Sequence, residues 1–234
     1  MRTDRYFPII TLFLALVCLP AVVFSTEDIS SLLEKRGPGA KEIVANPSLF
    51  REAKLPHLSI SRKQIEFLID NPHVAVTLAH LYAPYLDRYS VTVQPDHVIH
   101  IEDPGNPAGD AELIEARSGR RVYLIAGYYD LLKMRFNGDI ALITVYSEQR
   151  EHAMVSVDAT VIASIKIKSA FAGVLAQLAD FLFPKKVDER LARFSHAAED
   201  ISLAIRKDPK DVYRKLKASG EVSAEELEEF GRTF

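Results

Sequence analysis

Residues 118–163 read SGRRVYLIAGYYDLLKMRFNGDIALITVYSEQREHAMVSVDATVIA, and this stretch decides the fold. Three apolar runs rich in β-branched and aromatic residues follow one another in it, a pattern typical of strands. They cover residues 122–129, 140–146 and 153–163. Ser118-Gly119 is a hairpin turn signal before the first run, and the second run is expected to begin after Asn137-Gly138. Too little chain lies between the runs for crossover helices, so the stretch predicts an antiparallel sheet.

The sheet extends towards the N-terminus. Residues 89–93 and 97–101 alternate apolar and polar side chains, which predicts two further strands. A loop rich in Gly, Pro and Asp follows at 103–110, and the segment around Leu113 resumes the apolar pattern. Five or six strands are therefore expected in succession.

Helical signals flank the sheet on both sides. Before it, Ser61 and Gln64 form a capping-box pattern, and Asn71-Pro72 ends one helix and starts a second. After it, apolar stripes at 171–182 and 187–205 predict a long helix that Pro184 kinks or splits. Two short helices are expected after that, and their start signals are Asp208-Pro209 and Ser223 with Glu226.

The N-terminus has the layout of a secretory signal. Arg2 and Arg5 precede an apolar run from Phe7 to Phe24, and a polar segment begins after Ser25. Cleavage near Ser25 would export the protein to the periplasm or the extracellular space. An uncleaved membrane anchor is the alternative, because about 18 apolar residues is near the minimum for a span.

Cys18 raises a lipoprotein signal as another alternative, but bulky Val17 precedes it where Gly, Ala or Ser is expected. Cys18 is the single cysteine of the 234 residues, so cleavage would leave no disulfides. The expected organisation follows from these boundaries. It consists of a signal peptide at 1–25, a lead-in at 26–58, a main domain at 59–207 and a C-terminal helical tail at 208–234.

Composition limits the partners. The formal net charge of −3 gives no electrostatic case for nucleic acid binding. Hydrophobic residues make up 48% of the chain, enough for an ordinary packed core. The sequence does not define the oligomeric state.

The order of elements resembles the helix-grip fold of the START-like (SRPBCC, Bet v 1-like) superfamily. The resemblance covers roughly residues 59–205. It rests on two tandem helices, an antiparallel meander and a long apolar-striped helix, and on segments such as Phe67-Leu68-Ile69-Asp70-Asn71-Pro72. It implies an α+β fold in which a curved antiparallel sheet wraps around the long C-terminal helix. The superfamily places a strand before the tandem helices, and residues 55–60 are the candidate for it.

That fold would leave a gap between sheet and helix where an apolar molecule binds. Small side chains on one face of the last strand and on the helix favour such a cavity, although close packing explains the same residues. The candidate lining consists of Tyr123, Phe136, Val155, Val157, Ala159, Phe171, Val174, Leu175 and Leu178.

Catalytic signals are few. There is no HExxH, CxxC, GxSxG, GxGxxG or P-loop pattern, and no catalytic residue, metal site or cofactor is assigned. His97 and His100 would point to opposite faces of a strand, and His73 and His80 are too far apart for one ion. Oxygen ligands at 103, 106 and 110 do not have EF-hand spacing, so a plain turn is the preferred interpretation.

The leading hypothesis is an exported, non-catalytic binding protein for a lipid or other apolar small molecule. A transient membrane contact is compatible with it. One alternative is a structural or interaction protein of the cell envelope with a filled core. A third is a cyclase-like enzyme, which needs at least two of Tyr123, Arg135 and Asp158 pointing into the cavity.

Overall fold

The computed structural model describes residues 26–86, 90–94, 98–103, 106–131, 134–151, 154–168 and 172–234. The predicted signal segment lies outside these residues. The chain divides into two compact units, Met1–Lys41 and Glu42–Phe234. In the first unit, Lys41 Nζ lies 3.0 Å from Glu34 Oε1.

The described helices are α2 (Thr26–Glu34), α3 (Pro38–Ala45), α4 (Arg62–Asp70), α5 (Pro72–Tyr82), α6 (Ala172–Lys207), α7 (Pro209–Ser219) and α8 (Ala224–Thr233). The described strands are β1 (Leu49–Leu58), β2 (Ser90–Val93), β3 (Ile99–Asp103), β4 (Asn106–Arg117), β5 (Arg120–Leu131), β6 (Met134–Glu151) and β7 (Met154–Ile167). The protein is therefore of the α+β class, with a long helix after the sheet.

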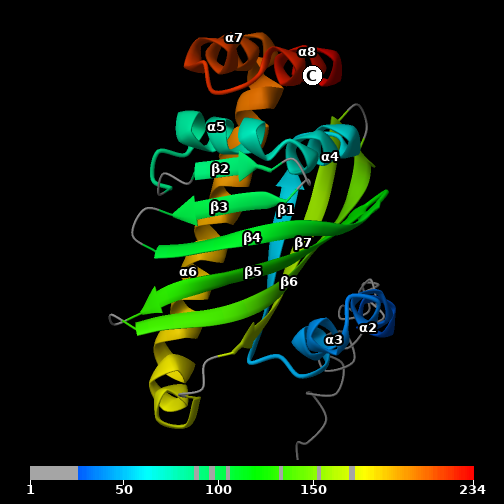
Figure 1. Cartoon of the computed structure of the whole chain (residues 1–234). Helices are drawn as coiled ribbons and strands as arrows, with labels where there is room; N and C mark the ends of the chain where they lie inside the picture. The colour runs from blue at the N-terminus through cyan, green and yellow to red at the C-terminus, as the bar shows by residue number, and fades with distance from the viewer. Residues whose placement is uncertain are drawn as a thin grey trace, which may run out of the picture. The chain divides into compact units, whose positions relative to one another are not determined.

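The described strands form one antiparallel sheet in the order β1-β7-β6-β5-β4-β3-β2 (Figure 1). Strands β2 to β7 pair with their neighbours in the chain, as the short connections require. Strand β1 joins the far edge beside β7, with Leu49 opposite Ile165. The predicted antiparallel sheet is confirmed.

Two turn predictions need correction. The expected loop at 103–110 is much shorter, because β4 already begins at Asn106. Asn137-Gly138 is not a turn but lies inside β6, opposite Tyr128 and Gly127. A Cβ atom at Gly138 would lie 2.9 Å from the carbonyl oxygen of Lys166, so this glycine permits close strand approach. Ser118-Gly119 does connect β4 and β5, and Gly119 has a φ of 80°.

The tandem helices begin as predicted. Gln64 N–H donates to Ser61 Oγ at 3.3 Å and Ser61 N–H to Gln64 Oε1 at 2.8 Å, which completes the capping box. Pro72 opens α5, but the Asn71 side chain does not cap it. Instead Asn71 Nδ2 donates to the carbonyl oxygen of Phe67 at 2.9 Å and closes α4.

Helix α6 is one continuous helix of 36 residues, so the predicted split at Pro184 is wrong. A proline removes one helical hydrogen bond, but packing on both sides of it can hold the helix together. Helices α7 and α8 follow, and Ser223 and Glu226 form the expected second capping box.

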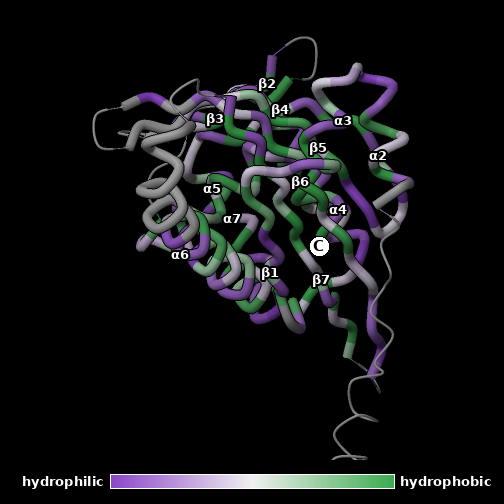
Figure 2. The backbone as a smooth tube through the Cα atoms, turned by 90° about the horizontal axis from the view of Figure 1, so that it is seen from below, coloured by the Kyte–Doolittle hydropathy of each residue, from purple (hydrophilic) through white to green (hydrophobic). Residues whose placement is uncertain are grey.

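The main core lies where the helices meet one end of the sheet. It joins residues of β1, β6 and β7 to residues of α4 to α8. Phe67, Phe230 and Phe234 form an aromatic cluster, in which the rings of Phe230 and Phe234 stack at 4.2 Å. The expected C-terminal tail therefore consists of two helices that supply part of this core. Figure 2 shows hydrophobic stretches along the central strands and along α5.

Phe230→Ala tests how far α8 stabilises the fold. Phe230 is 1% exposed, so its removal leaves a cavity and should lower the free energy of unfolding by about 3–5 kcal/mol. Urea unfolding followed by circular dichroism measures the loss. The control is Leu203→Ala on α6, because Leu203 is 48% exposed and should change stability by less than about 0.5 kcal/mol. Equal stability of the two variants would contradict the proposed contribution of α8.

Candidate functional site

One side of the sheet faces helices α4 and α6. Cross-strand partners carry their side chains on the same side, and one row of partners is apolar across the whole described sheet. The row consists of Val93, Ile99, Ala111, Ile125, Ile140, Ile165 and Leu49. Arg51 lies two residues beyond Leu49, on the same side, and its Nε is 2.7 Å from Asp188 of α6. We call this side the helix-facing side.

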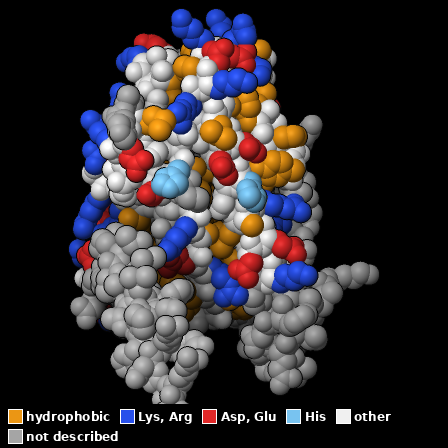
Figure 3. Space-filling view, turned by 180° about the vertical axis from the view of Figure 1, so that it is seen from behind, with side chains coloured by type: hydrophobic (Ala, Val, Ile, Leu, Met, Phe, Trp, Pro, Cys, Tyr) orange, Lys and Arg blue, Asp and Glu red, His pale blue; other side chains and the backbone are white. Residues whose placement is uncertain are grey.

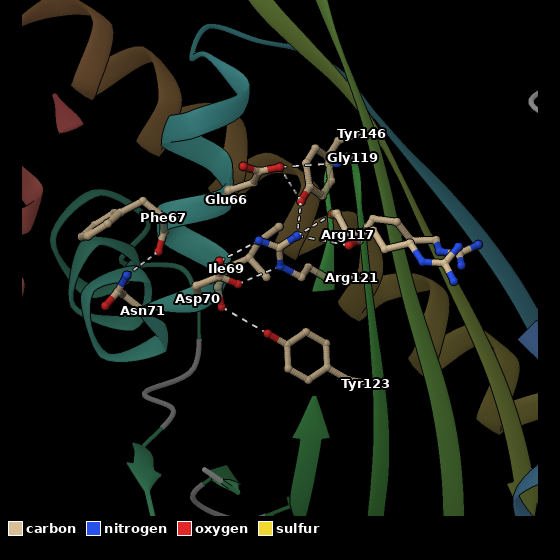
Figure 4. A network of polar contacts seen from close by, with 11 residues as sticks. Glu66, Phe67, Ile69, Asp70, Asn71, Arg117, Gly119, Arg121, Tyr123 and Tyr146 are labelled. Atoms are coloured by element: carbon tan, nitrogen blue, oxygen red, sulfur yellow. Dashed lines mark hydrogen bonds and ion pairs between the residues drawn. The ribbon is translucent and has the colours of Figure 1, made fainter. Parts of the chain in front are cut away.

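A polar cluster joins α4 to the helix-facing side (Figure 4). Its side chains are Glu66 and Asp70 on α4, Arg121 and Tyr123 on β5, and Tyr146 on β6. Glu66 and Asp70 are four residues apart and share one helix face. Arg121 and Tyr123 are two residues apart and share one strand face.

Arg121 lies at the centre of this polar cluster and is 6% exposed. Its Nε and one terminal nitrogen donate to the two carboxylate oxygens of Asp70 at 2.8 and 2.7 Å. The other terminal nitrogen donates to Tyr146 OH at 2.8 Å and to the carbonyl oxygen of Arg117 at 2.7 Å. Such a bidentate, charge-assisted pair fixes both the distance and the angle between α4 and β5.

The remaining groups of the polar cluster are also paired. Tyr146 OH donates to Glu66 Oε1 at 3.2 Å, and the N–H of Gly119 donates to the same oxygen at 3.4 Å. Tyr123 OH donates to the carbonyl oxygen of Ile69 at 3.3 Å. These partners are all protein groups, so the polar cluster attaches α4 to the sheet.

The electrostatics of the cluster agree with this role. The hydrogen bond to Asp70 raises the pKa of Arg121, and burial raises the pKa of Tyr146. Burial, with a smaller contribution from the Asp70 charge, raises the pKa of Tyr123 to about 12. Both phenols are therefore neutral at neutral pH and act as hydrogen-bond donors rather than bases.

A groove lies between β1 and α6. Its ends are fastened by polar contacts: Arg51 pairs with Asp188 at 2.7 Å, and the N–H of Ser59 donates to Ser202 Oγ at 3.2 Å. Arg206 strengthens the second end, because it donates to Ser59 Oγ at 3.2 Å. Apart from Asp188 itself, the residues that line the groove lie between these two attachments on both β1 and α6.

The groove has a volume of about 450 Å³. Its apolar lining consists of Ala53, Leu55, Leu58, Leu191 and Ala192. Its polar lining consists of Glu52, Lys54, Asp188, Ser195, His196 and Glu199. The α6 residues recur every three or four positions and so occupy one helix face, and the small side chains of Ala53 and Ala192 leave the space open. On the face seen from behind, described hydrophobic side chains lie among charges of both signs (Figure 3).

The predicted cavity residues have different positions. Tyr123 lies on the helix-facing side with its hydroxyl bonded to Ile69. Val157 and Ala159 lie on the same side and are packed in the main core, and Val155 is half-buried beside them. None of these residues lines the groove.

The other predicted cavity residues are not described in full. Phe136 is in β6, and Val174, Leu175 and Leu178 are in α6, but their side chains lie outside the described set. Phe171 lies wholly outside it.

The residues of the cyclase-like alternative do not come together. Tyr123 is on the helix-facing side. Arg135 lies opposite Asp130 of β5, and Asp130 points to the other side of the sheet from Tyr123. Arg135 therefore points to that other side as well, where its guanidinium carbon lies 3.7 Å from the centre of the Tyr128 ring. Asp158 is next to Val157 and also points to the opposite side, where it accepts the N–H of His57 at 3.1 Å.

The histidines form separate contacts. His100 Nδ1 is 2.7 Å from Asp110, whereas His73 and His80 lie near Glu226 and Glu221. His97 lies outside the described residues. Within the described part of the chain, no group of three or more His, Cys, Asp or Glu is placed to hold a metal ion.

Sequence reasoning missed Arg121, Asp70 and the β1 side of the groove. Asp70 was visible only as part of a helix end, and Arg121 stands beside Arg120 with nothing local to mark it as the buried one. The strand period does not mark it either, because Arg121 and Val122 point to opposite sides of β5 and both are buried.

The fold and site define an α+β protein with an antiparallel sheet, a long C-terminal helix and a groove beside that helix. None of the described helices is long and apolar enough to cross a membrane. The chain matches no model of a known protein family and shows no significant similarity to a curated protein.

Arg121→Met tests the polar cluster. The change leaves the Asp70 carboxylate and the Tyr146 hydroxyl without their donor, and it should lower the free energy of unfolding by about 2–4 kcal/mol. We expect less than for a fully buried pair, because the Asp70 side chain is 40% exposed and water can replace part of the interaction. Arg121→Lys should fall between Met and the wild type, because it keeps the charge but loses the bidentate geometry.

The matched control for Arg121→Met is Arg150→Met, which also removes an arginine from the sheet. The Arg150 side chain is 76% exposed, so its loss should cost less than about 0.5 kcal/mol. Urea unfolding at neutral pH measures all three variants. A structural role for Arg121 is excluded if the two Met variants unfold at the same urea concentration.

Tyr123→Phe should change how stability depends on alkaline pH. The folded-state pKa of Tyr123 is about 12, above the ordinary value of 10.0, so the unfolded chain loses this proton first as the pH rises. The resulting stability is fully present below pH 10 and is lost between about pH 10 and 12. The advantage of the wild type over Tyr123→Phe should therefore shrink by about 1 kcal/mol between pH 8 and pH 11, as measured by urea unfolding. A constant difference across this range would contradict the prediction.

Proposed function

We propose that this protein binds a lipid or other apolar small molecule between its sheet and α6 without chemically changing it. The observation that carries the proposal is the groove of about 450 Å³ between β1 and α6. Pockets for small molecules commonly measure about 300–1,000 Å³ and are mostly apolar with a few polar groups. The volume of the groove falls in this range, and its lining combines the apolar side chains of Ala53, Leu55, Leu58, Leu191 and Ala192 with six polar residues.

We further propose that the sheet wraps around α6 as in the helix-grip fold. The order of elements supports this, because β1, the helices α4 and α5, six further strands and the long α6 follow one another. The pairing of β1 with β7 supports it as well. Both edges of the sheet also contact helices: β1 contacts α6, β2 contacts α5, and α5 contacts α6.

A row of glycines supports bending of the sheet. Gly109, Gly127 and Gly138 are cross-strand partners on the helix-facing side of β4, β5 and β6. A Cβ atom at Gly127 would lie 2.6 Å from the carbonyl oxygen of Ala108, so a larger residue does not fit there. Glycine kinks at matched positions are a common means of curving a sheet.

Partly exposed apolar side chains favour a ligand over a completely filled interior. Val93 and Leu113 on the helix-facing side are 39% and 37% exposed. The alternative of an envelope interaction protein calls for a long exposed apolar stripe at 187–205 on α6. Ile201 and Ile205 of that stripe are buried whereas Phe194 is 44% exposed, so the described part of the stripe is not one continuous exposed surface, which gives this alternative less support.

The place of action in this proposal is outside the cytoplasm. This location is inferred from the N-terminal sequence, in which Arg2 and Arg5 precede an apolar run and a polar segment begins after Ser25. A carrier for poorly soluble molecules is useful in such a compartment. N-terminal sequencing of the secreted protein tests the cleavage.

Ala192→Phe tests the groove as the ligand site. The larger side chain would fill the space between β1 and α6, and laurate should bind at least about tenfold more weakly. Displacement of 1-anilinonaphthalene-8-sulfonate by laurate measures the affinity, and mass spectrometry of extracted lipid identifies what co-purifies. The matched control is Ala126→Phe, since Ala126 is exposed on the other side of the sheet and should leave binding unchanged. Absence of extracted lipid, together with equal laurate binding by both variants, would refute the proposal.

A further inference from the structure

The groove is bounded by the edge of a strand as well as by side chains. Four consecutive residues of β1 line it, namely Glu52, Ala53, Lys54 and Leu55. Successive side chains of a strand point to opposite sides of the sheet, so neither side of the sheet adjoins all four residues. Only the free edge of β1, where the backbone is accessible, does so.

This edge has unused hydrogen-bonding capacity. Strand β1 is the end strand of the described sheet and pairs only with β7. In the described structure, residues 52–55 make no hydrogen bond outside that ladder. Alternate N–H and C=O groups therefore face the groove, as on any edge strand.

A pure hydrocarbon would bury these backbone groups without a partner. Each buried N–H or C=O left unpaired costs about as much as a lost hydrogen bond, and often more. A ligand that carries donors and acceptors at strand spacing avoids this cost. An extended peptide has this spacing, and addition to a free strand edge is a recurring mode of peptide recognition.

We propose that the ligand of the groove is an extended peptide segment that adds to β1 as a further strand. This inference rests on the proposed function only in taking the groove to be the ligand site, and it assigns that groove a peptide in place of a lipid. The peptide backbone pairs with residues 52–55. Its alternate side chains lie against Leu55, Leu191 and Ala192, where small groove residues leave room for them.

Charge at the groove further narrows the peptide. Arg51 neutralises the charge of Asp188. The remaining charged residues of the lining are the two carboxylates of Glu52 and Glu199 and the one ammonium group of Lys54. The excess of one negative charge favours a peptide in which basic residues alternate with apolar ones. The apolar residues face α6, and the basic residues face solvent on the side of β1 that carries Glu52 and Lys54.

N-methylated peptides test strand addition without changing the protein. The parent probe is a capped seven-residue peptide in which lysine alternates with leucine and valine. Because alternate N–H groups of a strand point to opposite edges, methylating the lysine amides and methylating the leucine and valine amides block different edges. We expect one methylated peptide to bind like the parent and the other at least about tenfold more weakly, measured by fluorescence anisotropy on the purified chain.

Hydrogen exchange supplies the second measurement. The parent peptide should slow exchange of the backbone amides of 52–55, and laurate should not. Equal binding of both methylated peptides, or no protection of these amides, would overturn the inference.

Measuring laurate binding alongside peptide binding distinguishes this inference from the proposed function. If laurate binds in a manner that Ala192→Phe abolishes and the peptide does not bind, the inference fails and the proposed function stands. If neither probe binds, both fail. If the peptide binds with edge-specific sensitivity to methylation, the groove is a peptide site whether or not laurate also enters it.

Discussion

The pairing of β1 with β7 is the constraint on which the arrangement of the second unit depends. Leu49 lies opposite Ile165, so this ladder joins the first described strand of the chain to the last and closes a long loop between them. Closing so long a loop costs entropy, which the ladder and the packing around it offset. The antiparallel register brings the end of β1 beside the start of β7. Helix α4 therefore begins at one end of the sheet and α6 at the other, and α6 has to run the length of β1 to reach α4 and α5.

Two kinds of interaction hold the helices where this pairing directs them. The aromatic cluster around Phe230 supplies non-directional burial, which favours contact without fixing an angle. The bidentate pair of Arg121 and Asp70 is directional and fixes how α4 lies on β5. Every described group of the polar cluster has a protein partner, and its phenols have raised pKa values. A site for chemistry would instead need a group turned to open space with a pKa near neutral.

The sequence predicts what depends on local rules. Alternation and short connections indicated the antiparallel sheet, and Ser61 with Gln64 marked the start of α4. Strand β1 was placed too late, at 55–60, because charged Arg51 breaks its apolar alternation, and its partner Asp188 is far away in the chain. Gly138 indicated the end of a connection between strands. A glycine that allows two strands to approach closely cannot be told in the sequence from a glycine that a turn requires. Pro184 indicated a break because a proline removes one helical hydrogen bond, yet α6 continues through it.

The candidate site shows the same limit more strongly. A groove is a place where side chains fail to meet, and the small side chains of Ala53 and Ala192, from segments far apart in the chain, both line this one. Neither alanine differs in the sequence from one that packs tightly. The attachments Arg51–Asp188 and Ser59–Ser202 hold the ends of the groove, whereas Leu58 belongs both to the groove lining and to the main core, and Leu55 packs against that core. The lining residues Ala53, Leu191 and Ala192 lie outside the main core, so a change at these positions would alter the groove and leave the core contacts in place.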